Sequence, residues 1–153
     1  MPAERRMTRG TRPVRSNPLR AAVKGRFYPF AESRGFVREK SHNPLFILFR
    51  RTTDTAVHVF ELQWEKYGRP CFVINFGEGP SGESIGRLQP RQGAYLRHWF
   101  HIRKPWLEAI ATMKRSYEPE QVVDQLIALF PELEAWWDEK RVGPHLRFTR
   151  HAG

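Results

Sequence analysis

The chain has 153 residues, which is long enough for one domain with a sizeable core. Its single cysteine, Cys71, excludes an internal disulfide. No apolar run approaches the roughly 18 residues of a membrane span, and no apolar signal segment follows the first basic residues, so we expect a cytoplasmic protein. The formal net charge is +10, and residues 1–40, with eleven Lys/Arg and three Glu, carry +8 of it.

Residues 1–16 predict a disordered basic arm, because this segment is rich in Arg and has too few large apolar residues to offset the entropy of ordering. Such an arm has three possible roles. It only keeps the chain soluble, it contacts nucleic-acid phosphates or anionic lipid, or it acts as an Arg-rich transit peptide. Met7 is an alternative start to Met1. The arginines that would contact nucleic acid are Arg5, Arg6, Arg9, Arg12 and Arg15.

A helix is expected over residues 18–34, because apolar residues recur there at helical spacing. Asn17 caps its first turn, and Pro18 suits a position whose N–H needs no partner. Gly35 supplies the C-terminal stop. Pro29 lies inside the helix and is expected to kink or shorten its last turn.

Two short strands and a turn follow the helix. Leu45–Phe49 is apolar, Arg50–Thr55 contains turn residues, and Ala56–Glu65 alternates between apolar and polar residues. A third strand is expected over Cys71–Phe76. A three-residue loop, Tyr67–Arg69, with Gly68 or a neighbour in the left-handed region, connects the last two strands.

The apolar pattern selects the register of this hairpin, because a slip of one residue moves every side chain to the wrong face. The expected pairs are Trp64 with Phe72, Leu62 with Ile74, and Phe60 with Phe76. His58 shares this apolar face, so we interpret it as a core or edge histidine rather than a base.

Three polar side chains lie on the opposite face of the hairpin, with Glu61 opposite Asn75 and Gln63 opposite Val73. Glu61, Gln63 and Asn75 are therefore the candidate binding residues for a ligand or a protein partner. The alternative is that they form the solvated side of an antiparallel sheet, which commonly shows one face to water.

The segment "GEGPSG", residues 77–82, matches G-x-G-x-x-G, the spacing of a dinucleotide-binding loop. That loop needs a parallel strand before it, a helix after it and an acidic residue about 20 positions further on. Here a hairpin precedes it, Gly86, Pro90 and Gly93 exclude a helix of useful length, and "YLRHWFHIRK" contains no acid. We therefore expect a glycine loop without a nucleotide cofactor, leading to a fourth strand around Ala94–His101.

The C-terminal third is expected to be helical. A first helix begins at Pro105 and ends near Ser116, with Leu107, Ile110 and Met113 as its apolar stripe. A second begins at Glu118-Pro119 and is broken by Pro131, after which come a short acidic helix, a stop at Gly143-Pro144 and a short strand in "HLRF".

Residues that indicate chemistry are few. His98-x-x-His101 is the closest histidine pair, but residues three apart on a strand point to opposite faces and cannot chelate one metal, so no metal site is expected. No serine or cysteine lies in a nucleophile motif, so no catalytic residue and no cofactor are assigned. Aromatic residues accompany cations only around Tyr95, Trp99 and Trp106, and the cations that could contact nucleic acid there are Arg97, Arg103 and Lys104.

Several short motifs follow one another along the chain, namely Gly35-Phe36, Gln63, Tyr67-Gly68, Asn75 and Gly77. In this order the sequence resembles the bacterial domain of unknown function 4304 over about residues 18–140. The resemblance supports the fold and implies no catalytic residues.

We therefore expect an α+β fold over residues 17–153, in which the N-terminal helix and the C-terminal helices pack on an antiparallel sheet of about four strands. The first functional hypothesis is a non-catalytic interaction module with a protein partner. The second is a nucleic-acid-associated protein that uses its basic arm. A small hydrolase is the third.

Overall fold

The structure is a computed structural model that describes residues 17–91 and 99–149. It is an α+β fold with an antiparallel sheet of seven strands among the described residues, which corrects the expected number of about four. The predicted arm lies outside the described residues, as do Tyr95, Arg97 and His98.

The N-terminal helix forms as predicted and consists of α2 (Pro18–Ala22), the π-helical turn η2 (Val23–Phe27) and α3 (Tyr28–Ser33). Asn17 caps it, with its Oδ1 accepting from the Arg20 N–H at 3.0 Å. The wider η2 turn precedes Pro29, so the helix continues past the proline instead of ending there. Gly35 ends it with φ +91°, and the Phe36 N–H reaches back to the Ala31 carbonyl at 3.1 Å.

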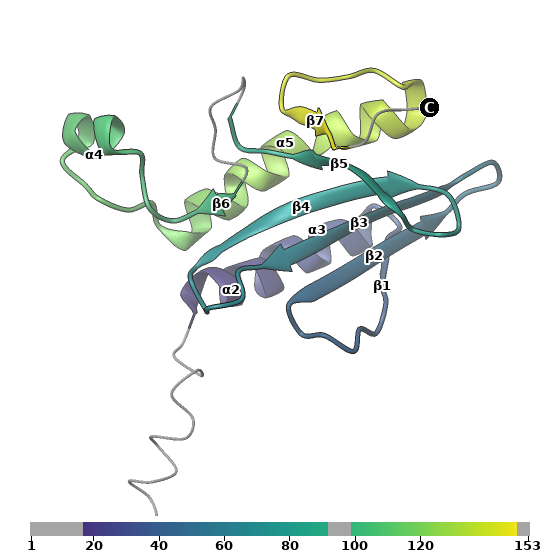
Figure 1. Cartoon of the computed structure of the whole chain (residues 1–153), viewed down its shortest axis with the longest axis horizontal. Coiled ribbons are helices and arrows are strands. Elements are labelled where there is room, and N and C mark those ends of the chain that lie inside the picture. Colours follow the sequence, from purple (N-terminus) through teal and green to yellow (C-terminus); the bar gives the residue numbers. More distant parts are fainter. Residues whose placement is uncertain (1–16, 92–98, 150–153) are drawn as a thin grey trace, which may run out of the picture.

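The strands are all antiparallel, and the sheet has the order β1-β2-β3-β4-β5-β7, with β6 paired to β4 beside this path (Figure 1). Their bounds are β1 Val37–Arg38, β2 Phe46–Thr52, β3 Val57–Trp64, β4 Cys71–Glu78, β5 Ser84–Leu88, β6 Phe100–His101 and β7 Leu146–Phe148.

The register predicted for the central hairpin, β3 and β4, is confirmed. Trp64 pairs with Phe72, Leu62 with Ile74, Phe60 with Phe76 and Glu61 with Asn75. In the loop between the strands, Gly68 takes the left-handed conformation with φ +87°. This hairpin leads into an antiparallel β4–β5 pair without a helix, so the geometry that a dinucleotide loop requires is absent from residues 77–82.

One strand of the sheet was not expected from the sequence. Residues 84–88 form β5, although Gly86 and Pro90 suggested a loop. Gly86 is needed in this strand because a Cβ there would lie 2.9 Å from the Phe76 ring and 2.7 Å from the Arg147 carbonyl oxygen. Of the strand expected over Ala94–His101, Phe100–His101 forms β6, and residues 94–98 lie outside the described residues.

The helix α5 (Pro119–Glu139) runs through Pro131, which was expected to break it. The helix persists because buried residues lie on both sides of the proline, with Leu126 and Phe130 before it and Leu133 and Trp137 after it. The helix α4 (Trp106–Thr112) buries no residue, so its apolar stripe does not pack on the sheet as the sequence suggested. The strand predicted in "HLRF" is confirmed as β7.

The core lies between one face of the sheet and the helices α2–α3 and α5 (Figure 1). Phenylalanines from the N-terminal helix, the sheet and α5 meet there, because the ring of Phe27 contacts Phe60 on β3 and Phe130 on α5. The face of β3 predicted to be apolar points into this core, and Phe60, Leu62 and Trp64 are all buried. This packing fixes the end of the β3–β4 hairpin, which carries the candidate site.

Candidate functional site

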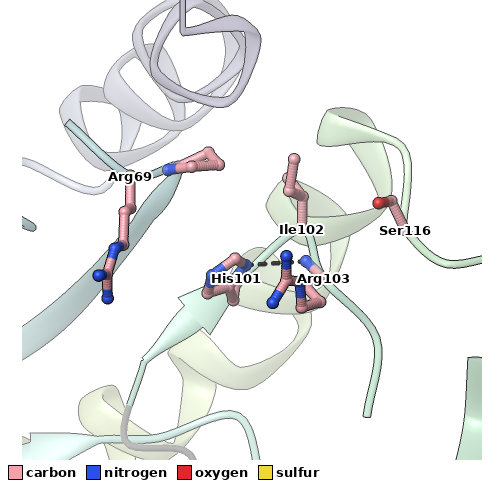
Figure 2. Close-up of a pocket in the computed structure, with 6 residues that line it drawn as sticks. Arg69, His101, Ile102, Arg103 and Ser116 are labelled. Atoms are coloured by element: carbon pink, nitrogen blue, oxygen red, sulfur yellow. Dashed lines mark hydrogen bonds between the residues drawn. The ribbon is translucent and has the colours of Figure 1, made fainter. Parts of the chain in front are cut away.

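A cavity of about 530 Å³ lies beside the β3–β4 turn (Figure 2). One side is formed by the turn and the other by the chain that follows β6. Figure 2 shows Arg69 on one side, Arg103 and Ser116 on the other, and His101 between them. The lining residues are Arg69, Pro70, His101, Ile102, Arg103 and Ser116.

Arg69 is positioned by the carboxylate of Glu65, which closes the β3–β4 turn. Glu65 Oε1 accepts from the backbone N–H of Tyr67 at 2.6 Å and of Arg69 at 3.2 Å. The other carboxylate oxygen lies 3.7 Å from Arg69 Nε. Because this contact uses Nε, the two terminal NH₂ groups of Arg69 remain available to a ligand, and the side chain is 71% exposed.

His101 reaches the cavity because β6 pairs with β4, which places His101 opposite Cys71. His101 Nδ1 accepts the backbone N–H of Arg103 at 2.8 Å (Figure 2). A nitrogen that accepts from an amide carries no proton, so the neutral imidazole has its proton on Nε2.

Ser116 is brought to Arg103 by an isolated antiparallel bridge between the two residues. Two backbone hydrogen bonds support it, from Lys104 N–H to the Arg115 carbonyl at 2.9 Å and from Tyr117 N–H to the Ile102 carbonyl at 2.6 Å. The far wall of the cavity is therefore held by backbone contacts.

The polar groups of the cavity are two guanidinium groups, an imidazole and a hydroxyl, and the described residues that line it include no carboxylate. Guanidinium forks match the geometry of carboxylate and phosphate oxygens, and hydrogen bonds to charged acceptors are stronger than neutral ones. Chemically, the cavity suits an anionic group of a small ligand or of a partner.

A second cavity of about 420 Å³ lies at the same end of the hairpin, with Trp64, Tyr67 and Trp99 in its wall. The Nε1 of Trp64 is the buried side-chain nitrogen that lacks a hydrogen-bond partner among the described residues. The lining is more aromatic than that of the first cavity, so it offers surface for a ring or an apolar group beside the basic cavity.

The three polar residues predicted as a binding face do come together on the sheet. Asn75 Nδ2 donates to Glu61 Oε1 at 3.0 Å and to Gln63 Oε1 at 3.1 Å. Arg87, which the sequence interpretation missed, donates from Nε to Asn75 Oδ1 at 2.9 Å. The amide of Asn75 is thus satisfied internally, and the adjoining hollow holds only about 10 Å³, less than a small ligand needs.

His58 is buried, as predicted for a core or edge histidine, and its ring stacks on Trp137 with centroids 5.1 Å apart. The Arg51 guanidinium lies 2.8 Å from His58 Nδ1 and also donates to Glu134 at 2.8 Å. Burial, followed by the charge of Arg51, lowers the pKa of His58 from its usual value. This group ties β2 and β3 to α5 at the edge of the core.

Among the predicted nucleic-acid contacts, Arg103 lines the basic cavity, and Lys104, the next residue, is not part of its lining. Lys104 Nζ donates to Thr112 Oγ1 at 2.9 Å and lies 5.3 Å from the Tyr117 ring centroid. Arg97 and the arm arginines lie outside the described residues. The sequence interpretation did not assign Arg69, His101 or Ser116 to a site.

Within the described residues, no helix is long and apolar enough to cross a bilayer, and no group of three or more His, Cys, Asp or Glu side chains could hold a metal ion. No family model, curated protein or solved structure matches the chain. The resemblance to the domain of unknown function 4304 stays a prediction from its short motifs.

Proposed function

We propose that the protein is a non-catalytic binding module whose basic cavity takes an anionic group, a phosphate or a carboxylate, carried by a small ligand or by a protein partner. The observation that supports this most is the convergence of Arg69, His101 and Arg103 on one cavity of about 530 Å³. Binding sites of small molecules are commonly of this size and hold a few convergent polar groups.

The sheet-face residues Glu61, Gln63 and Asn75 take a supporting role in this proposal. Their hydrogen bonds are made to one another and to Arg87, so they stiffen the strands β3, β4 and β5. A partner that presents an acidic side chain or a phosphorylated residue would place that group between Arg69 and Arg103.

The test is the melting temperature of the full chain in increasing phosphate, pyrophosphate or citrate, with sodium chloride keeping the ionic strength constant. A ligand that binds the native state raises the melting temperature in a saturable way. The combined Arg69→Gln and Arg103→Gln variant should lose this rise. Arg34→Gln with Arg38→Gln removes the same charge outside the cavity and should keep it, and the proposal fails if both double variants respond alike.

Nucleic-acid association is the second candidate function. It is favoured by the adjacent cations Arg103, which is exposed, and Lys104, which is half-buried, and by the net charge of +8 in residues 1–40. Titration of a labelled single strand over a range of salt would give the number of phosphate contacts from the slope of log K against log salt. A chain that lacks residues 1–15 should show a shallower slope. If binding instead depends only on Arg69 and Arg103, the cavity and not the arm contacts the phosphates.

A further inference from the structure

The helix α4 exposes its apolar side to solvent and turns a polar residue toward the protein. Trp106, Leu107, Ile110 and Met113 are 70%, 65%, 66% and 89% exposed. Glu108, on the other side of the helix, is half-buried and lies 3.5 Å from Arg91. Trp106 thus joins the three residues predicted for the apolar stripe, and we use this name for all four. An amphipathic surface helix normally buries such a stripe.

The stripe is part of a unit that projects from the body of the protein. Figure 1 shows α4 at one end of the molecule, away from the β2–β3–β4 part of the sheet. The neck of this unit is closed by the backbone bridge between Arg103 and Ser116 and by the hydrogen bond from Lys104 to Arg115. The two ends of this unit are therefore held together by backbone contacts.

Nothing in the described part of the fold uses these side chains. The structure buries none of the residues of α4, and Met113 ends the helix in the left-handed conformation with φ +58°, where glycine or asparagine is the usual residue. Clustered exposed apolar residues mark interaction sites more often than isolated ones do.

The charges beside the stripe select an anionic occupant. Lys114 and Arg115 follow Met113 directly and are both exposed, whereas the acid of the helix, Glu108, faces the protein. A second copy docked on this face through a twofold axis would bring these cations together. The stripe is also far smaller than the roughly 20–30 residues a side of a standard protein interface.

We propose that the apolar stripe, with Lys114 and Arg115, docks on the surface of a membrane that contains anionic lipids. Short apolar surfaces that carry Trp and are rimmed by Lys or Arg lie at the boundary between headgroups and acyl chains. The cations add attraction to the negative surface, and the apolar side chains enter the interface. The net charge of +10 on the chain acts in the same direction. The inference does not depend on a ligand in the basic cavity.

The experiment is sedimentation of the full chain with phosphatidylcholine vesicles, with and without phosphatidylglycerol. Only the anionic vesicles should bind the protein strongly. Leu107→Asn with Ile110→Asn should reduce the partition coefficient about tenfold or more, because two apolar side chains no longer leave water. Val142→Asn, at a site that is 59% exposed elsewhere, is the matched control and should bind like the wild type.

A second pair of variants tests the charges. Lys114→Glu with Arg115→Glu should weaken binding more than Lys24→Glu with Lys40→Glu, which makes the same change in net charge at exposed sites on other elements, not next to the stripe. In a Trp99→Phe background, Trp106 should also become protected from an aqueous quencher when vesicles are added, since Trp64, Trp136 and Trp137 are already buried.

Three outcomes would overturn this proposal. One is vesicle binding by the stripe variant that equals that of the wild type. Another is a wild-type dimer in solution that the stripe variant converts to a monomer. The last is nucleic-acid binding lost in the stripe variant while vesicle binding is unchanged. Arg69→Gln should keep vesicle binding, so a failure of the cavity proposal would be seen separately.

Discussion

The backbone N–H of Arg103 donates to Nδ1 of His101 at 2.8 Å, which orients the imidazole in the basic cavity. The hydrogen bond occupies Nδ1, so the neutral imidazole carries its proton on Nε2. We predict that Nε2 also donates to an anion bound in the cavity, and substitution can separate this role from the contact at Nδ1.

We expect His101→Asn to keep an acceptor near the position of Nδ1 but to lose the Nε2 donor. Its affinity for phosphate should fall about threefold to tenfold, the loss expected for one hydrogen bond, while its melting temperature stays close to that of the wild type. Calorimetric titration of both proteins checks this. An unchanged affinity would mean that Nε2 does not face the ligand.

Leu62→Ala tests the packing that supports the hairpin. Leu62 is fully buried on the core face of β3 opposite Ile74, so we expect the free energy of unfolding to fall by about 2–5 kcal/mol. Val37→Ala, at a residue that is 67% exposed, should change it by no more than about 0.5 kcal/mol. Urea unfolding followed by circular dichroism measures both, and a Leu62→Ala effect below about 1 kcal/mol would place this side chain outside the core.

Asn75→Ala should destabilise the protein by about 1–3 kcal/mol, because Glu61, Gln63 and Arg87 each lose a partner in a part-buried network. The exposed Thr55→Ala is the control. If the two variants unfold at the same urea concentration, the network contributes nothing to the stability of the sheet.

His58 makes stability depend on pH in a defined direction. Its pKa is lowered in the folded protein, so below about pH 6.5 the unfolded chain takes up a proton that the native state resists. Stability from this group is complete above the unfolded pKa and decreases as the pH falls toward the lower folded pKa. The melting temperature of the wild type should therefore fall more steeply between about pH 7.5 and 5.5 than that of His58→Phe. Equal slopes of melting temperature against pH in the two proteins would contradict this role of His58.

The central hairpin could be predicted from the sequence because its information is local. Alternation over residues 56–65 places Trp64 and Leu62 on one face, and the apolar residues of Cys71–Phe76 then allow one good register, which the structure has. The start of the first helix at Asn17 and its stop at Gly35 were equally local, since each depends on one capping residue.

The other strands and the cavity depend on contacts between distant residues. The strand β5 contains Gly86, which read as a loop signal, yet the glycine is there because β7 and Phe76 approach it closely. The strand β6 has only two residues and no alternation, so its pairing with Cys71 could not be foreseen. Nothing else in the sequence indicates that Arg69 and His101 lie in the same cavity.

The helices show the same limit. Pro131 favours a break by local rules, but the burial of Phe130 and Leu133 on either side outweighs that preference. The apolar spacing of α4 correctly indicated a helix with Leu107 and Ile110 on one side. Spacing alone could not show that this side faces solvent.

The most direct test of the proposed function is the affinity of the full chain for pyrophosphate, measured by isothermal titration calorimetry at constant ionic strength. We predict saturable binding that Arg69→Gln and Arg103→Gln each weaken about tenfold or more, as expected for loss of a charged hydrogen bond, and that Arg34→Gln leaves unchanged. An absence of binding by the wild type, or an equal loss in Arg34→Gln, would contradict the assignment of the basic cavity as an anion site.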